Sequence, residues 1–255
     1  MTVDFADMGV WGKMKVGAVR SHVHDFPVIF VWVTGPADLK AYANQEALNS
    51  LDEQALIQLP SFHCTDHSKV KVAEYLIKPW QAVWNKINSS ENLINWKGKY
   101  AEHKLVFQGH SLGGCVAQML AMTVVKKNEW PAEHVHSFVY NTPRCGNGDY
   151  AHYFMNNVQG HRAYWNNDPF QRHPPKLAED TQAKPVVYKN NYFHAGESMI
   201  LRESEDGLEA VGTSCAEEED VKCAVDPGKE NFKDHYTFNF DDDPEQFYNP
   251  VCPSH

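Results

Sequence analysis

The stretch Gly109-His110-Ser111-Leu112-Gly113 constrains what this chain can fold into more than any other feature of the sequence. Leu105-Val106-Phe107 before it is a short apolar run typical of a buried strand, and helical spacing follows it at Val116, Met119, Leu120 and Thr123. The five residues are therefore predicted to lie on a strand-to-helix turn. Glycines two residues away on each side of Ser111 leave room for a sharp bend, as in a G-x-S-x-G nucleophile elbow.

The chemistry that such a turn supports is nucleophilic attack by a serine. Ser111 Oγ is the candidate nucleophile, because the bend presents it outward. The backbone amide of Leu112, at the positive end of the following helix dipole, is a candidate oxyanion donor. A pattern with three fixed positions also occurs by chance in ordinary turns, but the flanking strand, the flanking helix and the additional Gly114 favour the catalytic interpretation.

Length and charge limit the remaining possibilities. A chain of 255 residues fits one sizeable α/β domain that spans residues 1–255. No apolar run in it reaches the length of a membrane span. The net charge of −10 argues against nucleic acid or an anionic membrane as the main partner, because both would repel the chain, whereas a neutral ester or a neutral lipid interface stays compatible.

The run from Val28 to Val33 is continuous, apolar and rich in β-branched residues, which predicts a strand buried on both faces in a parallel sheet. It ends at Thr34-Gly35-Pro36. Hydrolases with a nucleophile elbow take a second oxyanion donor from the turn after such a strand, so Thr34 or Gly35 is the candidate. A plain turn made by glycine and proline is an equally good interpretation of the same residues.

Two further segments have helical spacing. Ala37 to Gln58 is predicted to be a fixed surface helix, with a mobile lid over the site as the alternative. Lys71 to Ile87 is predicted to be a packing helix, in which Pro79 either produces a kink or lies in the first turn. The helix after Ser111 is expected to end near Lys126-Lys127-Asn128.

An acidic residue follows the second of two predicted downstream strands, His134 to Asn141 and His161 to Trp165. This residue, Asp168, is well placed to accept an imidazole N–H. Two later histidines, His194 and His235, compete as its partner, and both satisfy the order Ser, Asp, His of α/β-hydrolases. With 14 histidines in the chain, order alone does not choose between them.

The pairs His22/His24 and His134/His136 raise a metal site as an interpretation, because their spacing puts two rings on one face of a strand. No third ligand at a defined spacing accompanies either pair. We therefore predict neither a metal site nor an organic cofactor.

Several longer motifs, in their order along the chain, resemble those of the class 3 (fungal-type) lipases. The most discriminating are Asn141-Thr142-Pro143-Arg144-Cys145-Gly146-Asn147 and Asn167-Asp168-Pro169. The resemblance runs from about Val28 into the C-terminal region and also includes Gly109 to Gly114, His173-Pro174-Pro175 and Tyr192 to Glu197. It implies an α/β-hydrolase fold, in which helices flank a central, mostly parallel sheet.

The resemblance implies a serine hydrolase that cleaves carboxylic esters, with acylglycerols as the expected substrates. It makes Ser111 the nucleophile, Asp168 the acid and His235, within Asp234-His235-Tyr236, the histidine, and it gives His194 a structural role. Esterases for short-chain or feruloyl esters and phospholipases are the alternatives among enzymes. A catalytically weak binding or scaffold module is the alternative of another class.

The cysteines give two different expectations. Cys115 and Cys145 lie inside motifs where a small apolar side chain suffices, so both are expected to be buried free thiols. Cys215 and Cys223 bracket a polar, acidic loop that suits a disulfide. A short disulfide loop upstream of the late histidine is common in secreted lipases of this class, so the resemblance supports the same pair.

Two departures from the family pattern bear on activity and location. The family usually has phenylalanine, arginine, glycine and then threonine or serine at the oxyanion strand, where this chain has Trp32-Val33-Thr34-Gly35. Less sequence precedes this strand than in most members, and Met1 to Arg20 shows no secretory signal. Secretion is expected from the resemblance, and a cytoplasmic location is the alternative.

Overall fold

The strand that leads to Ser111 is β6 (Lys104–His110), and it belongs to an eight-stranded sheet. The other seven strands are β1 (Thr2–Asp7), β2 (Lys13–Val23), β3 (Phe26–Val33), β7 (Val135–Tyr140), β8 (Gln159–Trp165), β9 (Glu197–Glu203) and β10 (Ala210–Cys215). Their order across the sheet is β1-β2-β3-β6-β7-β8-β9-β10. Neighbours are parallel from β3 to β9 and antiparallel at both ends, which confirms the predicted mostly parallel sheet.

The structure is a computed structural model that describes residues 2–7, 13–23, 26–35, 45–52, 55–62, 69–88, 93–100, 102–165, 167–174, 192–203, 210–215 and 228–236. Cys223 lies outside these residues, and so does the bond expected between Cys215 and Cys223. No helix within the described ranges is long and apolar enough to cross a membrane.

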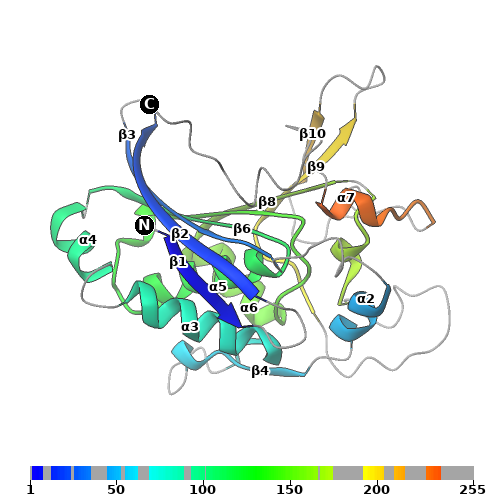
Figure 1. Cartoon of the computed structure of the whole chain (residues 1–255), viewed down its shortest axis with the longest axis horizontal. Coiled ribbons are helices and arrows are strands. Elements are labelled where there is room, and N and C mark those ends of the chain that lie inside the picture. Colours follow the sequence, from blue (N-terminus) through cyan, green and yellow to red (C-terminus); the bar gives the residue numbers. More distant parts are fainter. Residues whose placement is uncertain are drawn as a thin grey trace.

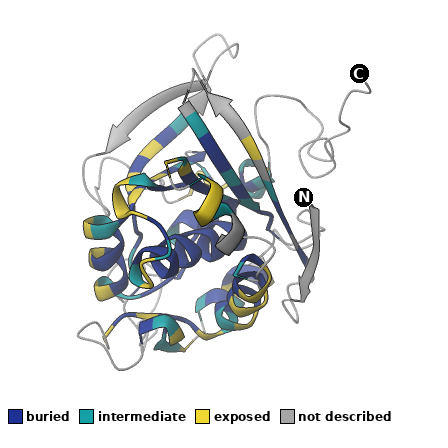
Figure 2. Ribbon diagram, turned by 90° about the vertical axis from the view of Figure 1, so that its left-hand side faces the viewer, coloured by how far each residue is buried: buried dark blue, intermediate teal, exposed yellow. Residues whose placement is uncertain are grey.

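The helix that follows Ser111 is α5 (Leu112–Lys126), and it lies at the centre of the molecule. Every residue from Leu112 to Val125 is buried, because the helix packs against the sheet, α3 (Ile77–Ile87) and α6 (Gly148–Asn157). These three helices lie on one side of the sheet in Figure 1, and the central helix is dark blue in Figure 2. A helix enclosed in this way can be apolar on all sides. Its end at Lys126 is the one that the sequence predicted.

The other helices among the described residues are short and lie around this core. They are α2 (Gln45–Asp52), α4 (Leu93–Tyr100) and α7 (Phe232–Tyr236), with 3₁₀ turns η2 (Pro60–Phe62), η3 (Glu74–Leu76), η4 (Ala132–His134) and η5 (Pro169–Arg172). Figure 1 shows α2, α7 and the turn after β8 at the same end of the molecule.

β3 is less completely buried than its sequence predicted. Ile29, Val31 and Val33 belong to the hydrophobic core that includes α5, whereas Phe30 and Trp32 are only half-buried. Val28, on the same face as Phe30 and Trp32, is buried, so the expectation of burial on both faces holds only in part. The run is continuously apolar because aromatic side chains occupy its partly exposed face. A strand of this kind lacks the alternation of apolar and polar residues that would indicate a partly exposed face.

The segment from Ala37 to Gln58 is not one helix. Among its described residues only α2 is helical, and strand β4 is formed by Leu56–Gln58. Asp52, at the end of α2, pairs with His173 through a contact of 2.7 Å between Oδ1 and Nδ1. The described helix is therefore packed onto the body of the protein, where its buried apolar side chains are Ala47, Leu48 and Leu51.

The prediction of one helix from Lys71 to Ile87 is wrong at its start. Strand β5 (Lys71–Ala73) pairs antiparallel with β4, and α3 begins only at Ile77. Pairing between segments that are distant in sequence leaves no mark on local spacing, so this strand could not be separated from the helix. Pro79 lies in the first turn of α3, which is one of its two predicted positions and one where a missing N–H costs no helical bond.

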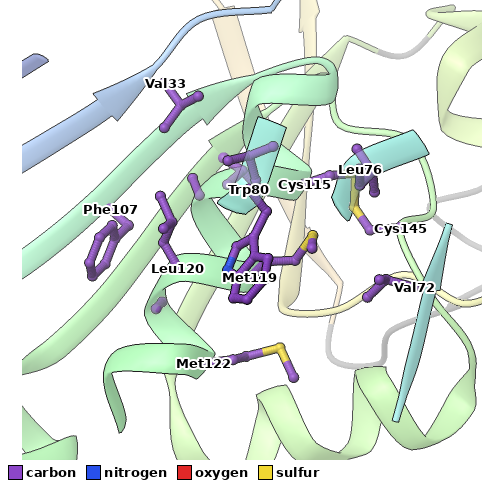
Figure 3. Packing of buried hydrophobic residues seen from close by; sticks show 14 of the residues in the cluster. Val33, Val72, Leu76, Trp80, Phe107, Cys115, Met119, Leu120, Met122 and Cys145 are labelled. Atoms are coloured by element: carbon purple, nitrogen blue, oxygen red, sulfur yellow. A yellow bond between two sulfur atoms is a disulfide. The ribbon is translucent and has the colours of Figure 1, made fainter. Parts of the chain in front are cut away.

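A disulfide joins Cys115 to Cys145 and corrects the expectation of two free thiols. The two residues are 30 positions apart in sequence, and their Cα atoms are 5.5 Å apart. Cys115 lies in the first turn of α5 and Cys145 in the loop after β7, so the bond ties the helix after Ser111 to the neighbouring loop (Figure 3). The approach of these two segments is a property of the fold that neither motif contains by itself.

The Cys115→Ala/Cys145→Ala double variant is expected to unfold more easily than the wild type. A cross-link across a loop of about 30 residues stabilises a fold by about 3–4 kcal/mol, mainly by restricting the unfolded chain. Urea unfolding without reductant measures the difference. Wild-type protein treated with a reductant should approach the midpoint of the variant, and a variant with the wild-type midpoint would contradict a stabilising bond.

Candidate active site

Ser111 lies at a strained bend between β6 and α5. Its backbone angles are φ 54° and ψ −132°, a conformation that residues other than glycine rarely adopt. A Cβ atom on Gly109 would lie 2.4 Å from the carbonyl oxygen of Gly113, and one on Gly113 would lie 2.2 Å from that of Thr34. The bend therefore requires glycine at both positions, which is the geometry expected of a nucleophile elbow.

Three side chains from distant parts of the chain lie together at this bend. His235 Nε2 is 2.8 Å from Ser111 Oγ, and His235 Nδ1 is 2.9 Å from Asp168 Oδ2. Ser111 is 2% exposed, and Asp168 and His235 are fully buried. Asp168 follows β8 and precedes η5, whereas His235 lies on α7, so each residue comes from a different element.

The hydrogen bonds assign the proton positions of His235. A carboxylate only accepts hydrogen bonds, so the ring donates from Nδ1–H to Asp168 Oδ2. The neutral ring then has an unprotonated Nε2, which accepts the hydroxyl proton of Ser111. This is the tautomer in which an imidazole can remove the proton of a serine.

The first turn of η5 holds Asp168 in place. Its Oδ1 accepts a hydrogen bond from the amide of Phe170 at 2.9 Å, as an N-cap residue does. The Phe170 ring stacks on the His235 ring, with centroids 3.8 Å apart and an angle of 18° between the planes. The amide of Asn231, just before α7, donates to the Asn167 carbonyl oxygen at 2.8 Å. The loop of Asp168 and the helix of His235 are therefore fixed to each other independently of their own bond.

Two polar side chains hold the backbone of His235, and neither was assigned a role in the sequence analysis. His110 donates from Nε2–H to the His235 carbonyl oxygen at 2.8 Å, and the Asn141 side chain donates to the same oxygen at 3.1 Å. Asn141 also donates to the Asp234 carbonyl oxygen at 3.0 Å and accepts from the Trp165 amide at 3.0 Å. Both side chains lie inside motifs, but a bond to a backbone carbonyl some 90 or more positions away has no local sequence signal.

His194, the competing histidine, does not take the position beside Ser111. Its Nε2–H donates to the Gln171 carbonyl oxygen at 2.8 Å, and its side chain is buried at 4% exposure. The structure therefore brings Ser111 and Asp168 together with His235, while His194 supports the backbone of η5.

The candidate oxyanion donors lie on two sides of Ser111. Leu112 is the first residue of α5, so its amide lies at the N-terminal end of the helix, where an N–H group has no carbonyl four residues before it within the helix. The end of β3 reaches the bend, since a Cβ atom on Gly35 would lie 3.2 Å from Ser111 Cβ. Thr34 is buried, at 9% exposure. Leu112 and Gly35 thus lie beside Ser111, and Thr34 precedes Gly35, so the oxyanion role of these residues stays a prediction.

The histidine pairs are not assembled into a metal site by the part of the chain that is described. No group of three or more His, Cys, Asp or Glu side chains there is arranged to hold a metal ion. His134 lies in η4 and His136 in β7, while His22 lies in β2 and His24 is outside the described residues. Burial, with a smaller contribution from Lys104, lowers the pKa of His136, so this ring favours its neutral form within the sheet.

The buried His110 predicts a loss of stability in acid. Burial is the main cause that holds the pKa of His110 well below its usual value of 6.5, and the neighbouring His235 ring, which would repel a second proton once it is itself protonated, adds to it. Below about pH 6.5 the unfolded chain therefore binds a proton that the folded protein does not, and the free energy of unfolding falls by about 1.4 kcal/mol per pH unit from this group.

Urea unfolding between about pH 7 and about pH 5 measures this slope. The matched variant is His110→Gln, whose amide can still donate to the His235 carbonyl but does not titrate. Its stability should fall less steeply than that of the wild type, and equal slopes would contradict the assignment to His110.

The fold and the site are those of an α/β-hydrolase. The features that define this class are the mostly parallel sheet, the glycine-flanked bend and the hydrogen bonds that join Ser111, His235 and Asp168. A family model described as Lipase (class 3) matches residues 43–178, which is more than half of the chain. The chain belongs to the class 3 lipase family, as its motifs predicted. The family's name places its members among the carboxylic ester hydrolases, which confirms the predicted enzyme class at the level of the family. No curated protein sequence matches the chain.

Solved lipase structures have the same fold. A Rhizomucor miehei lipase propeptide complex is 16% identical, with a TM-score of 0.67 over 93% of this chain and 66% of that chain. A lipase from Rhizopus microsporus var. chinensis is 17% identical, with a TM-score of 0.68 over 90% of this chain and 71% of that one. A triacylglycerol lipase from Penicillium expansum is 20% identical, with a TM-score of 0.61 over 93% of this chain and 82% of that one. The chain thus spans just under two thirds of the length of the Rhizomucor protein.

Proposed function

We propose that this protein hydrolyses carboxylic esters of lipids, most readily acylglycerols, through a covalent acyl-enzyme on Ser111. The observation that carries the proposal is the unbroken hydrogen-bonded chain from Ser111 Oγ through His235 to Asp168. Family membership and the triacylglycerol lipases among the structures with this fold support the substrate class. One such lipase is described as having a catalytic centre formed by a serine protease triad, which supports the same roles here.

In the first half-reaction, His235 Nε2 takes the hydroxyl proton as Ser111 Oγ attacks the carbonyl carbon of the ester. The π electron pair of the carbonyl moves to its oxygen, while Asp168 stabilises the imidazolium that has formed. When the tetrahedral intermediate collapses, the bond to the leaving alcohol breaks and His235 gives its proton to that alcohol. The acyl group stays on Ser111.

In the second half-reaction, water takes the place of the alcohol. His235 removes a proton from the water as its oxygen attacks the acyl carbon, and Ser111 Oγ leaves and recovers the proton from the imidazolium. The carboxylic acid is released and the resting state returns. No metal and no organic cofactor takes part in these steps.

The oxyanion of both intermediates is proposed to lie between the Leu112 amide and a donor at Thr34 or Gly35. Losing one donor of this kind typically lowers turnover about 10²- to 10³-fold. Because Trp32-Val33-Thr34-Gly35 departs from the family pattern, the second candidate function is a lipase-like scaffold with weak turnover. Turnover of a preferred ester within the range of ordinary enzymes would eliminate this candidate.

Hydrolysis of p-nitrophenyl esters of increasing chain length, with and without an emulsified interface, tests the proposed substrate. A lipase should prefer long acyl chains and gain activity at the interface. Preference for short chains without a gain at the interface would favour an esterase, and release of fatty acid from phosphatidylcholine but not from triacylglycerol would favour a phospholipase. No hydrolysis of any of these esters would overturn the proposed function.

An oxidising compartment, such as the outside of the cell, is the proposed location. The Cys115–Cys145 disulfide supports it, because such bonds persist where no thiol system reduces them. Mass mapping of alkylated protein isolated from its native host tests this proposal. Two alkylated, reduced thiols at these positions would favour the cytoplasmic alternative.

A further inference from the structure

The hydrogen-bonded chain that begins at Ser111 does not end at Asp168. Gln171 Nε2 lies 3.4 Å from Asp168 Oδ2, and Gln171 Oε1 lies 3.1 Å from Arg162 Nη1. Arg162 Nη2 in turn donates to Ser198 Oγ at 2.6 Å. Gln171 and Arg162 are each only 4% exposed, and Asp168 is fully buried. A buried cation and a buried carboxylate are therefore joined through one glutamine side chain.

The chemistry of the partners fixes the orientation of that glutamine. A guanidinium has donors only and keeps its charge, so the carbonyl oxygen of the Gln171 side chain must face Arg162. The amide N–H then faces the Asp168 carboxylate, which only accepts. The reversed amide would set donor against donor at one end and acceptor against acceptor at the other.

The backbone of Gln171 is held as firmly as its side chain. Its carbonyl oxygen accepts the hydrogen bond of His194 at 2.8 Å, and its amide donates to the Asp168 carbonyl oxygen at 3.3 Å. Arg162 lies on β8 and Gln171 on η5, so the elements on both sides of Asp168 supply its support. These contacts fix Gln171 relative to both the sheet and the acid.

We propose that Gln171, oriented by Arg162, is a positioning residue that holds the Asp168 carboxylate in line with His235. The inference rests on the proposed serine mechanism and goes beyond it, because it assigns to residues outside the three reacting groups the task of maintaining their geometry. A buried carboxylate without such a hydrogen bond can rotate away from the ring.

Arg162 is the cation that Gln171 joins to the acid, whereas Arg144, which is also buried, donates from Nη1 to the carbonyl oxygens of Arg172 and Pro174. His110, whose ring centroid is 5.1 Å from that of His235, is kept neutral because burial lowers its pKa. His194 is bound at the Gln171 carbonyl, and Asp234 accepts a hydrogen bond from Asn231 at 2.7 Å. The pair of Arg172 with Glu230, at 2.7 Å, lies at the more exposed edge of η5.

Replacing Gln171 with glutamate tests the proposal with little change in volume. The new carboxylate can still accept from Arg162, but it has no N–H for Asp168 and brings a second negative charge. We expect kcat to fall about tenfold with KM within about twofold, because the acid is misplaced rather than the substrate. The acid limb of the pH profile of kcat/KM should move to higher pH, since the added negative charge favours the protonated base.

Two further variants make the test specific. Gln171→Met removes the amide without adding charge, and it should lower kcat while moving the acid limb by less than Gln171→Glu does. The matched control is Gln118→Met, because Gln118 is a buried glutamine whose side chain joins Tyr150 and the Ala195 carbonyl rather than Asp168. This control should lose stability but keep the wild-type kcat and acid limb.

A readout without substrate separates this inference from the proposed function. The proton that His235 Nδ1 shares with Asp168 can be followed by proton NMR, and in Gln171→Glu its titration should move up in pH as the acid limb does. If the wild type hydrolyses no ester but this shift occurs, the proposed function fails and the positioning role stands. The positioning role of Gln171 would be overturned if both Gln171 variants kept the wild-type titration of this proton and the wild-type acid limb. It would also be overturned if both variants failed to fold while Gln118→Met folded.

Discussion

Ser111→Ala is expected to lower kcat for ester hydrolysis about 10⁵- to 10⁶-fold, the range seen when the nucleophile of a serine triad is removed. The reason is local, because the Ser111 hydroxyl is the one hydrogen-bonded to His235 Nε2, and alanine leaves no atom to form the acyl-enzyme. Hydrolysis of a p-nitrophenyl ester by purified, folded protein measures the loss. The matched control is Ser61→Ala, whose hydroxyl lies 3.2 Å from Thr123 Oγ1 and away from the site, so kcat should stay within about twofold of the wild type.

The same experiment tests whether Ser111 and His235 act as a unit. His235→Ala alone should cost about as much as Ser111→Ala, and the double variant should lose little more than either. Additive losses would mean that the two side chains contribute independently, which their 2.8 Å hydrogen bond does not permit. Residual turnover of Ser111→Ala above about 1% of wild type would show that another group is the nucleophile.

Asp168→Asn is expected to lower kcat about 10⁴-fold with little change in fold, as the equivalent change does in serine proteases. An asparagine amide presents an N–H where the carboxylate accepts from His235 Nδ1–H, so the ring turns to the tautomer whose Nε2 carries the proton. That ring can no longer take the proton of Ser111. Single-turnover acylation with a p-nitrophenyl ester isolates the affected step.

The control for this change is Asp149→Asn, at an acid in the first turn of α6 and outside the site. It should leave kcat unchanged. A fall of less than about tenfold in Asp168→Asn would mean that the carboxylate does not set the tautomer of His235, and would leave the ring to be oriented by Phe170 and the backbone contacts alone.

The part of the site that the sequence predicted well is the part with a local reason. The bend at Ser111 requires glycines, and these are visible in the sequence. The strand before the bend and the helix after it each have their own apolar spacing, so one short stretch indicates the complete nucleophile elbow. Asp168 was found for a similar reason, since it lies shortly after a strand and caps the 3₁₀ turn that follows. The choice of His235 over His194 depended on resemblance, because both fit the order along the chain.

What the sequence could not predict depends on contacts between distant segments. β4 and β5 have spacing that also suits helices, and only their pairing with each other makes them strands. The free-thiol prediction for Cys115 and Cys145 failed because their proximity arises from the packing of α5 beside the loop after β7. Asn141 and Gln171 act on carbonyl and carboxylate groups whose positions are set only in the folded chain.

The claim on which the rest depends is that Ser111 is made reactive by His235 and Asp168. Incubation of the native protein with a fluorophosphonate, followed by peptide mass spectrometry, tests it directly, because the reagent bonds only to a serine that a neighbouring base has activated. The triad predicts one adduct per chain, located on Ser111, which is absent from Ser111→Ala and formed far more slowly by His235→Ala. An unlabelled wild type, or an adduct on another serine, would contradict the claim.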